Sequence, residues 1–372
     1  MSTSLFSPFS MRKLTLANRI VVSPMCQYSA VDGRATDWHT VHWGQLLQSA
    51  AGMFTIEATA VSAIGRITFG YLGLYDDACE QALGERLAIA RANAPSMPVA
   101  IQLAHSGRKG SSKVPWEGGQ LIQVDQGGWI PLAPSAIAQL EHEPPPKAVD
   151  AATLAHIKRE FVDAAGRALR IGVCALELHM AHGYLLHEFL SPLSNRRNDA
   201  YGGSFEKRIR FPLEVFTAVR ELWPQDKPLG VRISATDWID GGWTIDDSIA
   251  FAQRLQAAGC DWVDVSSGGI SPAQKIPLGP GYQVPLARAI RGATSIPVIA
   301  VGLITEAKQA EAIIKSHDAD LVAMARAMLW DPRWPWHAAA TLGAQIHAPK
   351  QYWRSAPRDL PNVIAHAKVG QR

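Results

Sequence analysis

The clearest chemical signal in the chain is a pair of histidines three residues apart, His179 and His182, followed two residues later by Tyr184. The pair has three interpretations: ligands of a metal ion, buried structural residues, or N–H donors to one oxygen of a bound ligand. No carboxylate or third histidine stands in an obvious ligand position at another expected strand end. The sequence therefore favours oxygen binding over a metal site, with Tyr184 as a possible proton donor.

A second group of polar side chains suits a heterocyclic ligand. Gln102 can both donate and accept hydrogen bonds at a ring edge, and Arg232 favours an anionic ring nitrogen. The alternatives are a buried amide and a structural salt bridge. Cys26 lies between Met25 and Tyr28 and is either a packing residue or a thiol that touches a cofactor.

Gly302 and Arg326 are candidates for a phosphate site. Glycine lets the backbone approach a ligand closely, and a helix expected to start near Thr305 offers free N–H groups. Arg326 can pair with a dianion. The alternative is a tight turn with a surface arginine.

These residues lie at or near the ends of eight short apolar runs bounded by turn residues. Runs without strict alternation are typical of strands buried on both faces, as in parallel sheets. Helical periodicity fills several intervening segments, such as 154–168, and Thr244 and Thr305 are expected N-caps. The runs are Arg19–Pro24, Met53–Ala60, Met97–Leu103, Val173–His179, Pro228–Ser234, Asp261–Ser266, Ile296–Val301 and Asp320–Ala325.

A strand followed by a helix, eight times over, predicts an α/β fold, a (β/α)8 TIM barrel spanning residues 1–372 as one domain. A doubly wound open sheet is the alternative, but no Gly-x-Gly-x-x-Gly follows the first run. Residues 104–150, rich in Gly, Trp and Pro, interrupt the pattern after the third run. We expect them to form a lid over the C-terminal barrel face, where such enzymes carry their chemistry. The runs themselves are expected to be uncharged until their polar or cationic ends.

Composition excludes several classes of protein. The chain is 47% hydrophobic and 19% charged with a formal net charge of +3, which argues against disorder, collagen, coiled coil and nucleic-acid or membrane binding. The four cysteines are scattered without Cys-x-x-Cys spacing, so neither zinc ribbon nor disulfide framework is expected. With neither a signal peptide nor an apolar run of about 18 residues, we expect a cytoplasmic protein.

Five segments of the chain carry a family resemblance. They are Ser23–Tyr28, Ile101–Lys109, Glu177–Leu185, Phe189–Arg196 and Asp199–Ser204. Together they resemble the old yellow enzyme family, and within it the thermophilic-like class and the bacterial xenobiotic reductases. The resemblance runs from about Leu5 to Gln351, nearly the whole chain. Several independent motifs that follow one another in the family's order identify a family more specifically than any single motif does.

The resemblance implies an FMN-containing barrel with NADPH dehydrogenase-type activity. Such an enzyme takes hydride from NADPH or NADH and passes it from flavin N5 to activated C=C bonds of enones, enals and nitroalkenes, in a ping-pong cycle. It acts on small α,β-unsaturated molecules as a homodimer or homotetramer. A metal-dependent hydrolase on the same barrel and a non-catalytic flavin-binding barrel are the alternatives.

The resemblance also implies roles for residues at the expected strand ends. Gln102 would bind the pyrimidine edge of the flavin, and Arg232 would stabilise negative charge at its N1/O2 side. The flavin ring would also contact Ser23, Pro24, Met25, Cys26, Ala60 and His179. The phosphate would contact Gly302, Ala325 and Arg326. The family usually has Gly-Arg where this chain has Ala325-Arg326, so a Cβ must fit beside the phosphate.

The remaining implied roles concern the substrate. His179 and His182 would bind its carbonyl oxygen, Tyr28 would contact it and Tyr184 would be the proton donor. Cys26 would tune the flavin redox potential instead of acting as a nucleophile. The C-terminal tail, 345–372, would contact a neighbouring subunit, with Trp353 and Arg354 as the residues lent to its site.

Overall fold

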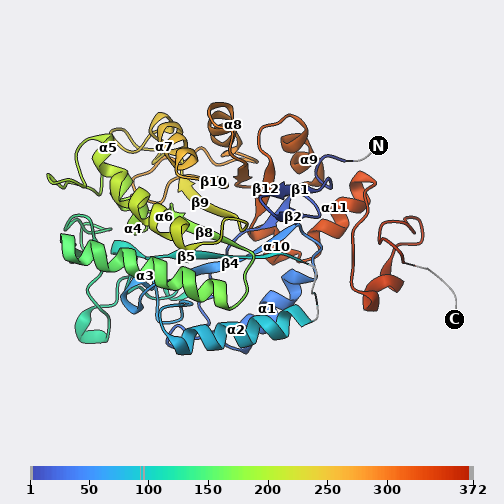
Figure 1. Cartoon of the computed structure of the whole chain (residues 1–372), viewed down its shortest axis with the longest axis horizontal. Coiled ribbons are helices and arrows are strands. Elements are labelled where there is room, and N and C mark those ends of the chain that lie inside the picture. The colour runs from blue at the N-terminus through green and yellow to red at the C-terminus, as the bar shows by residue number, and fades with distance from the viewer. Residues whose placement is uncertain (1–2, 93, 95–96, 368–372) are drawn as a thin grey trace.

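Eight parallel strands close into a barrel in this computed structural model, which describes residues 3–92, 94 and 97–367 (Figure 1). Each of the eight predicted runs overlaps one barrel strand, so the predicted barrel is confirmed and the open sheet is excluded. The strands, in chain order, are β3 (Ile20–Val22), β4 (Met53–Ala60), β5 (Val99–Ala104), β8 (Ala175–Met180), β9 (Leu229–Ser234), β10 (Trp262–Ser266), β11 (Val298–Val301) and β12 (Leu321–Met324).

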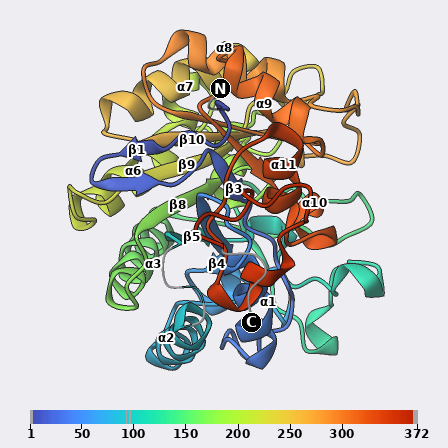
Figure 2. The same cartoon turned by 90° about the vertical axis from the view of Figure 1, so that its right-hand side faces the viewer.

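Helices cover the outside of the barrel (Figures 1 and 2). The longest one that the structure describes buries the apolar stripe predicted between residues 154 and 168. The helices are α1 (Asp37–Leu47), α2 (Asp77–Ala92), α3 (Ala151–Arg170), α4 (Leu185–Leu190), α5 (Phe205–Arg208), α6 (Arg210–Leu222), α7 (Ile245–Ala257), α8 (Val284–Ala293), α9 (Ala307–Lys315), α10 (Arg326–Trp330) and α11 (Trp334–Leu342).

One of the two predicted N-caps is confirmed. Thr244 caps α7 in a capping box with Asp247, each side chain accepting from the other's backbone N–H. The prediction for Thr305 is wrong, because Glu306 is the N-cap of α9. The backbone N–H of Thr305 donates instead to the Gln309 side chain at 3.1 Å, so the helix begins one residue later.

The barrel is closed at its N-terminal end by an antiparallel hairpin, β1 (Phe9–Met11) and β2 (Leu14–Leu16). Met11 and Leu16 are buried in one apolar cluster with inward residues of the strands, among them Met53 and Trp262. This end of the barrel is therefore filled by side chains, and the opposite end is where polar residues gather.

The segment 104–150 has little regular structure. It contains three single-turn 3₁₀ helices, η2 (Gly107–Lys109), η3 (Pro115–Glu117) and η4 (Val124–Gln126), and a short parallel pair, β6 (Leu132–Ala133) with β7 (Lys147–Ala148). The ring of Trp116 packs edge-on against Tyr28 with centroids 5.9 Å apart. The insertion thus reaches the end of the first barrel strand, and its action as a lid stays a prediction.

The C-terminal segment lies at the opposite end of the barrel. Its 3₁₀ helix η5 (Lys350–Ser355) borders a groove with residues that precede β3, β4 and β5, including Asn18 and Pro98. The indole of Trp353 donates to the carbonyl of Ala348 at 3.1 Å. Trp353 and Arg354 therefore do not reach the C-terminal face of their own barrel, and residues 368–372 of the predicted tail lie outside the described residues.

Inside the barrel, side chains from neighbouring strands stack in register. Gln102, Glu177, Gly230 and Trp262 are successive cross-strand partners on β5, β8, β9 and β10. Trp262 donates its indole N–H to Glu177 at 3.0 Å, and a Cβ at position 230 would overlap the indole ring. The glycine therefore provides the space in which the indole reaches the carboxylate.

We expect Gly230→Ala to destabilise the protein by about 1–3 kcal/mol, because the new methyl group must displace a ring that is held by a buried hydrogen bond. Urea unfolding monitored by circular dichroism measures this change. Gly292→Ala in α8 is the matched control, since a Cβ there meets nothing within 4 Å and should be neutral or stabilising. Equal stabilities of the two variants would contradict this account of Gly230.

Candidate active site

The two predicted histidines and Tyr184 come together at the C-terminal mouth of the barrel. His179 lies in β8, and His182 and Tyr184 follow in the turn that leads to α4. The ring centroid of His179 is 5.0 Å from those of both His182 and Tyr184, with both pairs edge-on. The structure thus confirms the proximity that the sequence spacing predicted.

The turn that carries His182 is tightly held by neighbouring strands. The His182 backbone N–H donates to Ser234 Oγ at 2.9 Å, and its Nε2 lies 2.7 Å from Ser266 Oγ. Lys109 Nζ donates to the His182 carbonyl at 2.8 Å and also to the Gly269 carbonyl. The imidazole therefore has a fixed orientation, set by residues of β9, β10 and the 104–150 segment.

Both histidines are neutral. Burial is the main cause that lowers the pKa of each well below the usual 6.5, and the positive charge of Arg232 is the second. A neutral imidazole can donate one N–H to a ligand oxygen. His179 Nδ1 is buried and has no hydrogen-bond partner among the described residues, which leaves it available to a ligand.

A salt bridge holds Arg232 inside the barrel. His179, Arg232 and Asp264 are cross-strand partners on β8, β9 and β10. Arg232 Nε lies 3.5 Å from Asp264 Oδ2, and both side chains are nearly fully buried. The structural salt bridge that the sequence left open is therefore present, in direct register with a candidate substrate-binding histidine.

The expectation of uncharged strands is wrong, because β4, β8 and β10 each contain a buried carboxylate. Glu57 accepts from the Gln27 backbone N–H at 2.5 Å, and Glu177 accepts from Gln102 at 2.7 Å. Asp264 pairs with Arg232. Partners on adjacent elements make each of these charges tolerable. Neither Glu177 nor Asp264 was predicted as a site residue. The sequence feature that could have indicated them is a single acidic residue inside an apolar run.

Cys26 lies in an apolar cluster at the mouth that also contains Tyr28, Ala60, Tyr71 and Tyr184. Burial raises the pKa of the Cys26 thiol to about 12, and the charge of Glu57 adds to this. The group is therefore a protonated thiol at neutral pH. That state disfavours a nucleophilic role, which needs a thiolate.

Ser23 links the first and last barrel strands at the mouth. It follows β3, is buried, and donates its backbone N–H to the carbonyl of Met324 at 3.0 Å. Its hydroxyl has no hydrogen-bond partner among the described residues. Pro24 and Met25 continue from it as half-buried residues.

The residues predicted to bind phosphate lie at the ends of the adjacent strands β11 and β12. Gly302 has φ 114, a conformation that favours glycine, and a Cβ there would overlap the Gln283 side chain. Ala325 has φ −105, so its Cβ causes no backbone strain. Arg326 begins α10 and is exposed, so its guanidinium is accessible to an anion.

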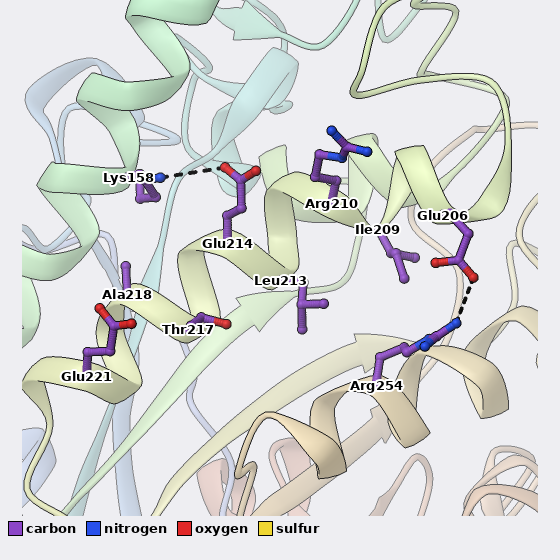
Figure 3. Close-up of a pocket in the computed structure, with 10 residues that line it drawn as sticks. All are labelled: Lys158, Glu206, Ile209, Arg210, Leu213, Glu214, Thr217, Ala218, Glu221 and Arg254. Carbon is purple, nitrogen blue, oxygen red and sulfur yellow. Dashed lines mark hydrogen bonds and ion pairs between the residues drawn. The ribbon is translucent and has the colours of Figure 1, made fainter.

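Another concave region lies on the outer wall of the barrel. It is a groove of about 500 Å³ between α3, α6 and α7, shown in Figure 3. Two ion pairs lie along it: Lys158 lies 3.6 Å from Glu214, and Arg254 lies 2.8 Å from Glu206. None of its lining residues comes from a strand end, so it is separate from the site at the mouth.

Neither a metal-binding cluster nor a membrane-spanning helix occurs in residues 3–92, 94 and 97–367. No group of three or more His, Cys, Asp or Glu side chains that could hold a metal ion is present among these residues. Within the same part of the chain, no helix has both the length and the apolar character needed to cross a bilayer.

Comparison with known proteins identifies the family. Residues 4–345 match the NADH:flavin oxidoreductase / NADH oxidase family. The chain is 46% identical over 356 residues to an NADPH dehydrogenase of Geobacillus thermodenitrificans, covering 95% of this chain and 99% of that protein. It is 41% identical over 355 residues to an NADPH dehydrogenase of Listeria innocua, with coverage of 95% and 99%.

Solved structures agree with this assignment. A structure of morphinone reductase superimposes with a TM-score of 0.74 at 25% identity, covering 99% of this chain and 94% of that one. The protein therefore belongs to the NADH:flavin oxidoreductase / NADH oxidase family, which includes the old yellow enzymes. It is an NAD(P)H:flavin oxidoreductase, and the resemblance found in the sequence is confirmed.

The buried carboxyl of Glu177 gives a pH test of the barrel interior. Burial and the charge of Asp264 raise its pKa from 4.5 to about 7. Between these two values the folded chain binds more protons than the unfolded chain, so stability falls as pH rises. Glu177→Gln should remove this loss, so that the variant gains stability relative to wild type from pH 5 to pH 7.

Urea unfolding at pH 5, 6, 7 and 8 measures this difference. The matched control is Glu221→Gln, which makes the same substitution at an exposed position of α6. A constant offset between Glu177→Gln and wild type at all four pH values would contradict the raised pKa.

Proposed function

We propose that this oxidoreductase is an FMN-dependent ene-reductase, which uses NADPH or NADH to reduce activated C=C bonds of enones, enals and nitroalkenes. The observation that carries the proposal is the pair of neutral, buried histidines, His179 and His182, edge-on to each other and next to Tyr184 at the barrel mouth. Such a pair suits one polarised oxygen of a small substrate.

The polar atoms at the mouth fit a flavin. Ser23 Oγ and His179 Nδ1 are buried without a hydrogen-bond partner among the residues that the structure describes. These are groups that a ligand rich in nitrogen and oxygen can satisfy. Gln102 lies on the same inward face as Glu177, to which it donates, and its own amide oxygen can still accept from a ring edge.

In this proposal the cofactor contacts are those that the family resemblance implied. Ser23, Pro24, Met25, Cys26 and Ala60 would line the flavin ring, and Gly302, Ala325 and Arg326 would bind the phosphate. The protonated state of Cys26 agrees with a thiol that adjusts the redox potential by contact. FMN, when bound, supplies the hydride for the substrate and is reduced by the nicotinamide.

The remaining chemistry belongs to side chains of this chain. His179 and His182 donate N–H groups to the carbonyl or nitro oxygen and stabilise the negative charge that develops there. Burial raises the pKa of the Tyr184 phenol well above 10, which keeps its proton in place until a carbanion-like carbon takes it. Tyr28, at the edge of the same cluster, would contact the substrate.

The proposal includes a homodimer or larger assembly. Trp353 and Arg354 lie near the N-terminal end of their own barrel, so only those of a neighbouring copy could line this site. The 104–150 segment would cover the mouth, as the contact of Trp116 with Tyr28 suggests.

The proposed function is tested with the purified protein. We expect a yellow preparation that releases FMN on denaturation and, with oxygen removed, consumes NADPH steadily only when an enone such as cyclohexenone is present. Bound metal with hydrolase activity would replace the proposal with a metal-dependent hydrolase. A flavin spectrum without NADPH consumption would indicate a non-catalytic flavin-binding barrel.

His179→Ala should slow enone reduction by about 10²–10³-fold, as expected for loss of one donor to a developing oxyanion. Reduction of the flavin by NADPH should change far less, because no charge of this kind develops on the nicotinamide. Stopped-flow measurement of the two half-reactions separates the effects. His156→Ala, at an exposed position of α3, is the control, and equal slowing of both half-reactions would contradict the role of His179.

A further inference from the structure

A buried pair of side chains lies directly behind the histidine turn. His187 on α4 and Asp237 after β9 are both fully buried, and His187 Nε2 lies 3.0 Å from Asp237 Oδ1. The second carboxylate oxygen, Oδ2, accepts from Ser191 Oγ at 2.6 Å and from the Trp243 backbone N–H at 2.7 Å. Neither His187 nor Asp237 is among the residues predicted from the sequence to form the site.

These contacts keep Asp237 ionised. Burial alone raises the pKa of Asp237, but its contact with His187, together with the hydrogen bonds from Ser191 and the Trp243 backbone, lowers this pKa below its usual range. An ionised carboxylate can only accept hydrogen bonds. The atom of His187 that faces it is therefore the one that carries a proton.

The other ring nitrogen of His187 holds the catalytic turn. His187 Nδ1 accepts from the backbone N–H of Gly183 at 2.8 Å. A nitrogen that accepts this bond cannot itself carry a proton, so the ring proton is on Nε2. Asp237 stabilises the same tautomer from the opposite side of the ring.

The turn held in this way is conformationally unusual. His182 and Gly183 have φ values of 60 and 73, so two consecutive residues are left-handed. Such backbone persists only where its surroundings fix it. The Gly183 N–H is fixed by His187, the His182 N–H by Ser234 and the His182 carbonyl by Lys109.

We propose that His187, held in its Nε2–H tautomer by Asp237, is a positioning residue that sets the left-handed turn at His182–Gly183 and thereby the direction of the His182 imidazole. The consequence for substrate reduction rests on the function proposed above, in which His182 binds the substrate oxygen. The tautomer and the position of His182 can be measured independently of it.

Asp237→Asn is the sharpest test, because it changes hydrogen bonding with little change in shape. The Trp243 N–H still requires an acceptor, so the amide oxygen must face it and the amide NH₂ must face His187. His187 Nε2 then becomes an acceptor and the proton moves to Nδ1. Two N–H donors, of Nδ1 and of Gly183, then face each other, and the hydrogen bond between them is lost. A tautomer switch of this kind is a known way to disable a histidine without moving it.

The matched control is Ser191→Ala. This change removes a hydrogen bond to the same carboxylate but leaves an acceptor in front of His187 Nε2. The tautomer of His187 should therefore stay as in the wild type, whereas any general weakening of the pair would affect both variants.

The experiment records ¹⁵N spectra of the histidine rings in the holoenzyme and the rates of both half-reactions. In Asp237→Asn we expect the His187 proton on Nδ1, shifted ring signals of His182, and enone reduction slower by about 10- to 100-fold. Flavin reduction should stay within about two-fold, and Ser191→Ala should resemble the wild type in every readout.

Other outcomes overturn the proposal in distinct ways. An unchanged tautomer in Asp237→Asn contradicts the hydrogen-bond assignment, and an unchanged His182 spectrum contradicts the positioning role. A full tautomer switch with undiminished enone reduction contradicts its catalytic consequence. A wild-type holoenzyme that reduces no enone refutes the proposed function alone, since the spectra still decide how His182 is positioned.

A second pair of variants covers the case in which Asp237→Asn does not fold. The amide oxygen of His187→Asn can stand in for Nδ1 and accept from Gly183, whereas His187→Leu cannot. We expect His187→Asn to preserve the His182 ring signals and most of the rate, and His187→Leu to lose both. Equal behaviour of these two variants would overturn the proposal.

Discussion

The site depends on one constraint, which is that charged side chains inside a closed parallel barrel must find their partners on neighbouring strands. Every barrel strand is paired on both edges, and water cannot solvate the interior. Glu177 is satisfied by Gln102 and Trp262, and Asp264 by Arg232. The contacts of Gln102 with Glu177 and of Arg232 with Asp264 join adjacent strands, and the contact of Trp262 with Glu177 reaches across β9 at Gly230. The register of the strands therefore determines which charges can be buried.

The same register determines the chemistry at the mouth. Arg232 is the cross-strand partner of both His179 and Asp264, so its positive charge lies beside the histidines and its partner carboxylate lies on the far side. Burial, with this charge, keeps His179 and His182 neutral. A neutral imidazole binds an oxygen by donation without the cost of a buried cation.

Sequence alone predicted the elements and the strand-end residues well, because both follow from local patterns. Apolar runs gave each barrel strand, and His179, His182 and Tyr184 were brought together by the turn that contains all three. The partners Glu177 and Asp264 could not be assigned, because their pairing depends on register between residues 30 or more positions apart. The start of α9 was predicted one residue too early for a related reason. The Gln309 side chain, one turn ahead, accepts from the Thr305 backbone N–H, and this contact is not evident from the local pattern.

The ends of β11 and β12 differ in how strongly their backbone conformation favours glycine. Gly302 has a positive φ and no room for a Cβ beside Gln283, which is itself held by Ser267 and the Val301 carbonyl. Ala325, by contrast, has φ −105, which any residue adopts. A close backbone approach to a ligand at this edge therefore requires glycine at the first strand end only.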